Sequence, residues 1–118
     1  MKKISNYDLE DRTAHFGEKV IKFCIRVNEN AITRVLISQV IRSSTSIGAN
    51  YMEANSASSK KDFKNKISIC RKESTETRHW LKMLAQALPE RKKDIKILYQ
   101  ESYELSLIFS KIISTLNN

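Results

Sequence analysis

The sequence predicts an all-α protein that folds as an antiparallel, up-down-up-down four-helix bundle in a single domain over residues 1–118. Three observations support this. Four segments carry apolar or small residues at alternating spacings of three and four, no segment alternates as a strand would, and the connections between segments are short. With 118 residues, one Pro and two Gly, the chain is long enough for one hydrophobic core but not for two.

The first two helices are expected over residues 7–28 and 31–57, separated by Asn28 and Asn30. The stripe of the first helix, at spacing 4,3,4,3,4, is Leu9, Thr13, Phe16, Val20, Phe23 and Val27. The stripe of the second is Ile37, Val40, Ser44, Ile47, Tyr51 and Ala54. Both stripes follow the period of a helix with one buried face.

The third and fourth helices are expected over residues 59–88 and 94–117. The serines at 56, 58 and 59 precede the third helix, and Pro89 with the charges after it ends it. The stripe of the third helix is Phe63, Ile67, Cys70, Ser74, Thr77, Leu81, Leu84 and Leu88. The stripe of the fourth is Leu98, Ser102, Leu105, Phe109, Ile112 and Leu116.

The second helix has an unusual composition in the stretch RSSTSIGANYMEA, residues 42–54. Between Val35 and Ser59 only Arg42 and Glu53 are charged, whereas a helix covered on one face should show a polar outer face. The sequence therefore predicts burial on more than one side, most simply by another subunit. A second stripe at spacing 3,4,3,4 is the expected contact: Ser43, Ser46, Asn50, Glu53 and Ala57.

The net charge of +8 is concentrated in residues 60–93, which hold eleven Lys and Arg against four Asp and Glu. The candidate residues form two clusters, one at each end of the third helix: Lys60, Lys61, Lys64, Lys66, Arg71 and Lys72, and then Arg91, Lys92 and Lys93. A solvated lysine-rich face and a surface that contacts nucleic-acid phosphates are both compatible with this pattern.

Catalytic and metal sites are not predicted. Glu76 and His79 have the Glu-x-x-His spacing of di-iron bundles, but the full site needs two such motifs and two further glutamates. Cys24 and Cys70 form no CxxC pair, and no glycine-rich loop is present. We expect a non-enzymatic protein with no cofactor, metal or small-molecule substrate.

Neither a signal peptide nor a membrane span is predicted. The N-terminal segment MKKISNYDLEDRT turns acidic where a signal peptide is apolar, and no window approaches eighteen uncharged apolar residues. With two unpaired cysteines, a cytoplasmic location is expected.

Several motifs in one order resemble a bacterial four-helix-bundle family. They are Arg42-Ser43, Ser46-Ile47, Asn50 and Glu53-Ala54, then Ser59-Lys60-Lys61-Asp62-Phe63, and then Lys72-Glu73, Glu76-Thr77 and Trp80-Leu81. This pattern resembles the 23S rRNA intervening-sequence protein family, or S23 family, which is related to the accessory variability determinant of diversity-generating retroelements. The resemblance implies a homopentameric barrel, no catalytic activity, and a nucleic-acid-handling partner such as a reverse transcriptase.

Carried over to this chain, the motif positions are candidates for fixing helix register and subunit contacts: Arg42, Ser43, Ser46, Asn50, Glu53, Glu73 and Glu76. If the second and third helices fold back around residue 58, Arg42 lies near Glu73 and Asn50 near Lys66. The prediction is a self-assembling bundle whose basic surface binds RNA, DNA or a nucleic-acid-handling partner. The alternative is an oligomeric protein-interaction scaffold that binds no nucleic acid.

Overall fold

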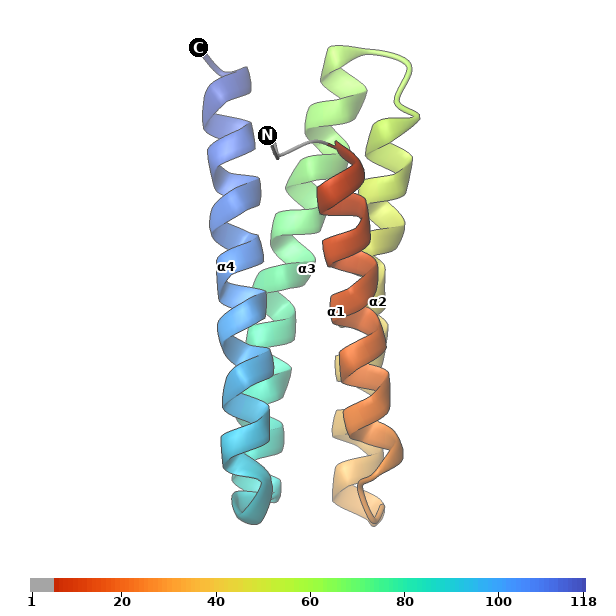
Figure 1. Ribbon diagram of the computed structural model, residues 1–118, viewed down its shortest axis with the longest axis vertical. Coiled ribbons are helices and arrows are strands. Elements are labelled where there is room, and N and C mark those ends of the chain that lie inside the picture. The colour runs from red at the N-terminus through yellow and green to blue at the C-terminus, as the bar shows by residue number, and fades with distance from the viewer. Residues whose placement is uncertain (1–5) are drawn as a thin grey trace.

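The computed structural model describes residues 6–118, which contain four α-helices, one short 3-10 helix and no strand. The α-helices are α1 (Asn6–Ile25), α2 (Ala31–Asn55), α3 (Lys60–Ala87) and α4 (Lys92–Leu116), and the 3-10 helix η1 (Pro89–Arg91) precedes α4. Each helix runs antiparallel to the one before it (Figure 1). This is the predicted all-α four-helix bundle, elongated to 45 × 31 × 21 Å. Residues 1–5 lie outside the described residues. They belong to the N-terminal segment for which no signal peptide is predicted.

Helix boundaries differ from the expected ones by up to three residues, because capping groups decide them. Asn30 Oδ1 accepts hydrogen bonds from the backbone N–H groups of Ile32 and Thr33, and Thr33 Oγ1 accepts one from Asn30 N at 2.8 Å. This capping box starts α2 at Ala31. The Ser59 hydroxyl accepts from Asp62 N at 3.0 Å and starts α3. Pro89 follows the last residues of α3 and opens η1.

The core runs along the centre of the bundle and contains the predicted stripes except at their ends, where Phe63, Ile112 and Leu116 are only half-buried. Its largest fully buried side chains include Phe16, Ile47, Tyr51, Leu81 and Phe109. The small polar members of the stripes are buried as well, including Ser44, Ser74, Thr77 and Ser102. A serine or threonine hydroxyl on a helix can donate a hydrogen bond to the backbone carbonyl of the preceding turn, as Ser74 Oγ does to Cys70 O at 2.9 Å. Such a hydroxyl can be buried at little cost in free energy.

Small residues bring α1 and α2 close together. A Cβ atom placed on Gly17 would lie 3.5 Å from Thr45 Cγ2, and one on Gly48 would lie 3.4 Å from Thr13 Oγ1. Any longer side chain at either position would meet the facing helix. The glycine in RSSTSIGANYMEA therefore allows close packing against α1 within one chain.

Candidate nucleic-acid interface

The nine basic residues predicted to contact nucleic acid divide into free and paired cations. Lys60, Lys61, Arg71, Lys72, Lys92 and Lys93 are exposed, and none of them forms an ion pair with any residue from 6 to 118. Two others have carboxylate partners: Lys66 Nζ lies 2.7 Å from Glu53 Oε1, and Arg91 Nε lies 3.3 Å from Asp94 Oδ2. The remaining one, Lys64, donates to Asn117 Oδ1 on α4.

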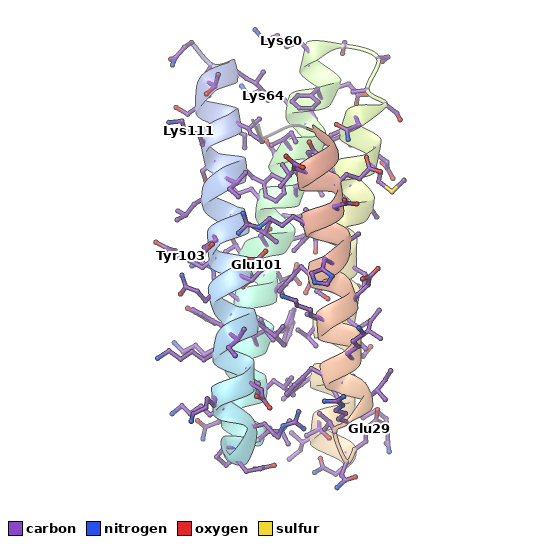
Figure 2. The ribbon with its side chains drawn as sticks, in the orientation of Figure 1. Glu29, Lys60, Lys64, Glu101, Tyr103 and Lys111 are labelled. Carbon is purple, nitrogen blue, oxygen red and sulfur yellow. The ribbon has the colours of Figure 1, made fainter. Side chains whose placement is uncertain are left out.

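The outer surface of α3 carries a row of cations without ion-pair partners within residues 6–118. Lys61, Lys64, Arg71, Lys72 and Lys82 lie on its outward side, and we refer to these five residues as the α3 basic face. Lys82 was not among the residues predicted from the sequence, although it lies eleven residues, close to three turns, after Arg71. It shows that the positive charge extends along α3 instead of stopping at the helix start. Figure 2 shows Lys60 and Lys64 at the end where α2 and α3 are joined.

Two carboxylates of α3, those of Glu73 and Glu76, bind Arg42 on α2. Arg42 Nη2 lies 2.5 Å from Glu76 Oε2, and Arg42 Nη1 lies 3.5 Å from Glu73 Oε1. Burial alone would raise the pKa of Glu76, but hydrogen bonds from Trp80 and Arg42 and the charges of Arg42 and Lys72 outweigh it, so the pKa is lowered. The predicted proximity of Arg42 and Glu73 is confirmed.

The carboxylates in the middle of α4 point toward α1. Arg12 holds Glu101 through two hydrogen bonds of 2.8 and 2.9 Å and reaches Glu104 at 3.0 Å. Hydrogen bonds to Glu101 and its charge raise the pKa of the Arg12 guanidinium. In Figure 2 Glu101 and Tyr103 extend from opposite sides of α4. The surface shared by α3 and α4 on the far side from α1 and α2 is therefore free of these four glutamates.

The polar stripe of α2 is partly used within the chain. The hydroxyls of Ser43 and Thr77 are 2.8 Å apart and buried, which links α2 to α3. Asn50 Nδ2 donates to Ser46 O and Ser46 Oγ at 2.8 and 2.9 Å. The expected pairing of Asn50 with Lys66 is wrong, since Lys66 pairs with Glu53.

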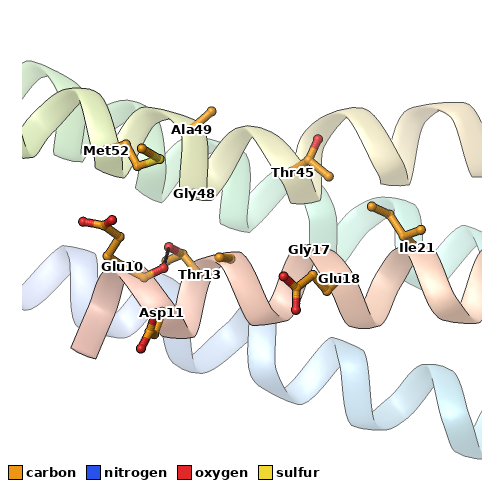
Figure 3. A pocket seen from close by; sticks show the side chains of 11 residues that line it. Glu10, Asp11, Thr13, Gly17, Glu18, Ile21, Thr45, Gly48, Ala49 and Met52 are labelled. Atoms are coloured by element: carbon orange, nitrogen blue, oxygen red, sulfur yellow. Dashed lines mark hydrogen bonds between the residues drawn. The ribbon is translucent and has the colours of Figure 1, made fainter. Parts of the chain in front are cut away.

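Two grooves flank α2. One, of about 420 Å³, lies between α1 and α2 and is lined by small and apolar residues such as Gly17, Ile21 and Met52, with Glu10 and Glu18 at its rim (Figure 3). The second, of about 530 Å³, lies between the start of α2 and the end of α3, where Ile32, Trp80 and Met83 line it. Met52 and Ile32 are 58% and 67% exposed.

The side chains that could bind a metal ion do not form a cluster in the described part of the chain. Within residues 6–118 no three His, Cys, Asp or Glu side chains come together. Glu76 accepts hydrogen bonds from Arg42 and from Trp80 Nε1 at 3.3 Å, while His79 packs its edge against the Trp80 ring. Burial raises the pKa of the Cys24 thiol to about 11 and that of Cys70 to about 12.

None of the helices described is both long and apolar enough to cross a bilayer. The fold and the charge distribution together define a class: small four-helix bundles with internally paired carboxylates and an uncompensated basic outer face. The chain belongs to the 23S rRNA-intervening sequence protein family, whose model matches residues 6–111. This confirms the family resemblance drawn from the motifs.

A solved structure from the same family supports the fold. It is the crystal structure of a protein of unknown function from the S23 ribosomal protein family of Bacteroides thetaiotaomicron. That protein is 30% identical to this chain, with a TM-score of 0.78, over 88% of this chain and 96% of the other. No curated protein matches the sequence significantly.

Proposed function

We propose that this protein is a non-enzymatic, self-assembling helical bundle that binds RNA or DNA through the α3 basic face. One observation carries the proposal: the glutamates of α3 and of the middle of α4 are bound to Arg42 and Arg12, which leaves the cations on the outer side of α3 without partners. An uncompensated row of Lys and Arg attracts a polyanion and gains affinity by releasing its counterions.

The unpaired cations and the paired carboxylates lie on different sides of the bundle. A protein that is basic only for solubility would intersperse both signs on its exposed faces. Here the paired carboxylates lie on the sides of α3 and α4 that face other helices. The family name supports RNA as the ligand, because it refers to proteins encoded within rRNA intervening sequences. A reverse transcriptase or another nucleic-acid-handling protein is the partner class that the family relationship favours.

Self-assembly into a homo-oligomer, a pentamer by analogy with the family, is part of the proposal. The groove between α1 and α2 supports it, because the apolar side chains beside this groove remain uncovered within one chain. Ile21 and Met52, which line the groove, are 38% and 58% exposed. Burying such side chains against another copy would stabilise the assembly at roughly 25 cal/mol per Å². A ring of copies would repeat the α3 basic face around its circumference.

The proposal is tested by filter binding of labelled RNA and DNA of mixed sequence at several salt concentrations. An electrostatic binder loses affinity linearly on a log-log plot against salt, with a slope of about 0.7 to 0.9 per phosphate contacted. Replacing Lys61, Arg71, Lys72 and Lys82 together by Gln should lower both the affinity and the slope. The matched control replaces four exposed cations of α1, the turn after it and α2 by Gln: Lys19, Lys22, Arg26 and Arg34. Absence of binding at low salt overturns the proposal, and light scattering of the same samples reports the assembly size.

A second candidate function, a scaffold that binds only protein, is favoured by the groove beside Trp80. Apolar residues from two helices line it, and Ile32 at its edge is largely exposed. Such a groove suits an apolar anchor from a partner protein. A protein that binds no nucleic acid at low salt, but whose binding to a partner is lost in Trp80→Ala, would fit this function instead.

A further inference from the structure

The α3/α4 surface carries aromatic rings beside its cations. Tyr99 and Tyr103 of α4 are 36% and 39% exposed and lie one turn apart on the same side of the helix. The guanidinium carbon of Arg78, on α3, lies 5.0 Å from the centre of the Tyr103 ring. This contact joins a cation and an exposed aromatic ring across two helices.

The packing register places a second cation of α3 at the level of Tyr99. Lys64 contacts Asn117, and Arg78 contacts Tyr103; these two pairs are fourteen residues apart on each helix, so they fix one antiparallel register. Lys82, four residues after Arg78, therefore falls opposite Tyr99, four residues before Tyr103. The Arg78–Tyr103 contact and the level shared by Lys82 and Tyr99 place two cations of α3 and two tyrosines of α4 on neighbouring turns of one surface.

Arg78 has unused hydrogen-bonding capacity. Its Nε is buried without a hydrogen-bond partner, and the guanidinium forms no ion pair within residues 6–118. The nearest glutamates in sequence, Glu73 and Glu76, are held by Arg42 on the opposite side of α3. A guanidinium that is fixed against a ring and has no carboxylate partner is suited to bind a phosphate oxygen.

We propose that Arg78, Tyr99, Tyr103 and Lys82 form a stacking platform for single-stranded nucleic acid, in which the tyrosine rings stack on unpaired bases and the two cations bind the adjacent phosphates. This deepens the proposed function and rests on it. The two tyrosines are about 6 Å apart along the helix axis, compared with a rise of about 3.4 Å per stacked base along a duplex axis. A stacked duplex offers no free base faces at this spacing, whereas an extended single strand does.

The test compares three labelled probes by fluorescence anisotropy with the full-length protein. They are a twelve-nucleotide oligo-dT, a strand of equal length in which every base is absent, and a twelve-base-pair duplex. Stacking requires bases, so with two stacked bases the protein should bind oligo-dT at least about 30-fold more tightly than the abasic strand. The duplex and the abasic strand should show only the electrostatic component.

Two sets of variants distinguish the contribution of the tyrosine rings to affinity from that of the cations. Tyr99→Leu combined with Tyr103→Leu should lower the affinity for oligo-dT to that for the abasic strand, while the matched pair Tyr99→Phe and Tyr103→Phe should keep it. Arg78→Gln should weaken binding of every strand and reduce the salt slope by about 0.7, the value for one phosphate on a single strand. Lys22→Gln, on the outer side of α1, should change nothing. Circular dichroism and light scattering confirm that each variant keeps its helix content and size.

Equal affinity for oligo-dT and the abasic strand, or no effect of the leucine variants, would overturn the platform. Salt-dependent binding that is lost only when the α3 basic face is neutralised would leave the proposed function intact in that case. Absence of binding to all three probes at low salt would overturn both.

Discussion

Arg42 on α2 joins two carboxylates of α3, with Nη2 at 2.5 Å from Glu76 Oε2 and Nη1 at 3.5 Å from Glu73 Oε1. The Glu73 side chain is only 10% exposed, so Arg42 neutralises a nearly buried negative charge. The same contact holds the α3 carboxylates on the α2 side and leaves the α3 basic face uncompensated. One arginine thus connects the stability of the helix pair with the charge of the outer surface.

Arg42→Ala should destabilise the protein by about 1–3 kcal/mol, because it leaves Glu73 buried without its cation. Urea unfolding followed by circular dichroism measures this. The control is Arg34→Ala, which breaks an exposed pair with Glu29 and should stay within about 0.5 kcal/mol of the parent. Equal effects of the two substitutions would contradict a structural role for Arg42.

Stability should fall in acid partly through Glu76. Its pKa is lowered from the ordinary value of 4.5 in the folded state, so the unfolded chain binds the proton more readily. The stabilisation is present above that value and is lost as the pH falls through the folded pKa. Melting temperatures measured between pH 7 and pH 3 should drop less steeply for Glu76→Gln than for the parent. Parallel curves would show that Glu76 does not contribute.

Substitutions at Gly17 distinguish the effect of helix propensity on stability from the effect of packing between α1 and α2. A Cβ there meets Thr45 Cγ2 at 3.5 Å, an ordinary contact, so Gly17→Ala should stabilise the protein by about 0.5–1 kcal/mol through helix propensity. Gly17→Leu should destabilise it by about 1–3 kcal/mol, since the longer chain collides with α2. Thermal unfolding of both variants checks the sign. A stabilising leucine would show that α1 can move away from α2 freely.

The two thiols should react slowly in the folded protein. Burial raises the pKa of Cys24 to about 11 and of Cys70 to about 12, so little thiolate exists at pH 8. Mass spectrometry after maleimide treatment should find both thiols unlabelled in buffer and labelled in urea. Cys24 should react before Cys70, which is fully buried. Rapid labelling of Cys70 in buffer would show that the core opens.

The family motifs and the helical period anticipated much of the candidate surface. The basic residues of α3 were recognised from composition, but Arg78 and Lys82 were not singled out, and Tyr99 and Tyr103 carried no signal of their own. Their significance depends on which residues of α3 and α4 face each other, and spacing within one helix does not contain that information. The same reason explains the wrong pairing of Asn50 with Lys66.

The sequence by itself determined that four helices form, where they break, and which residues are buried. These properties follow from local chemistry: a spacing of three and four places side chains on one face, and Asn30, Ser59 and Pro89 start or end helices by satisfying or removing backbone hydrogen bonds. The tertiary structure alone decided the charge of each face. The contacts with Arg42 and Arg12 hold Glu73, Glu76, Glu101 and Glu104 on the sides of α3 and α4 next to α2 and α1, and those contacts form only when the helices pack in one register.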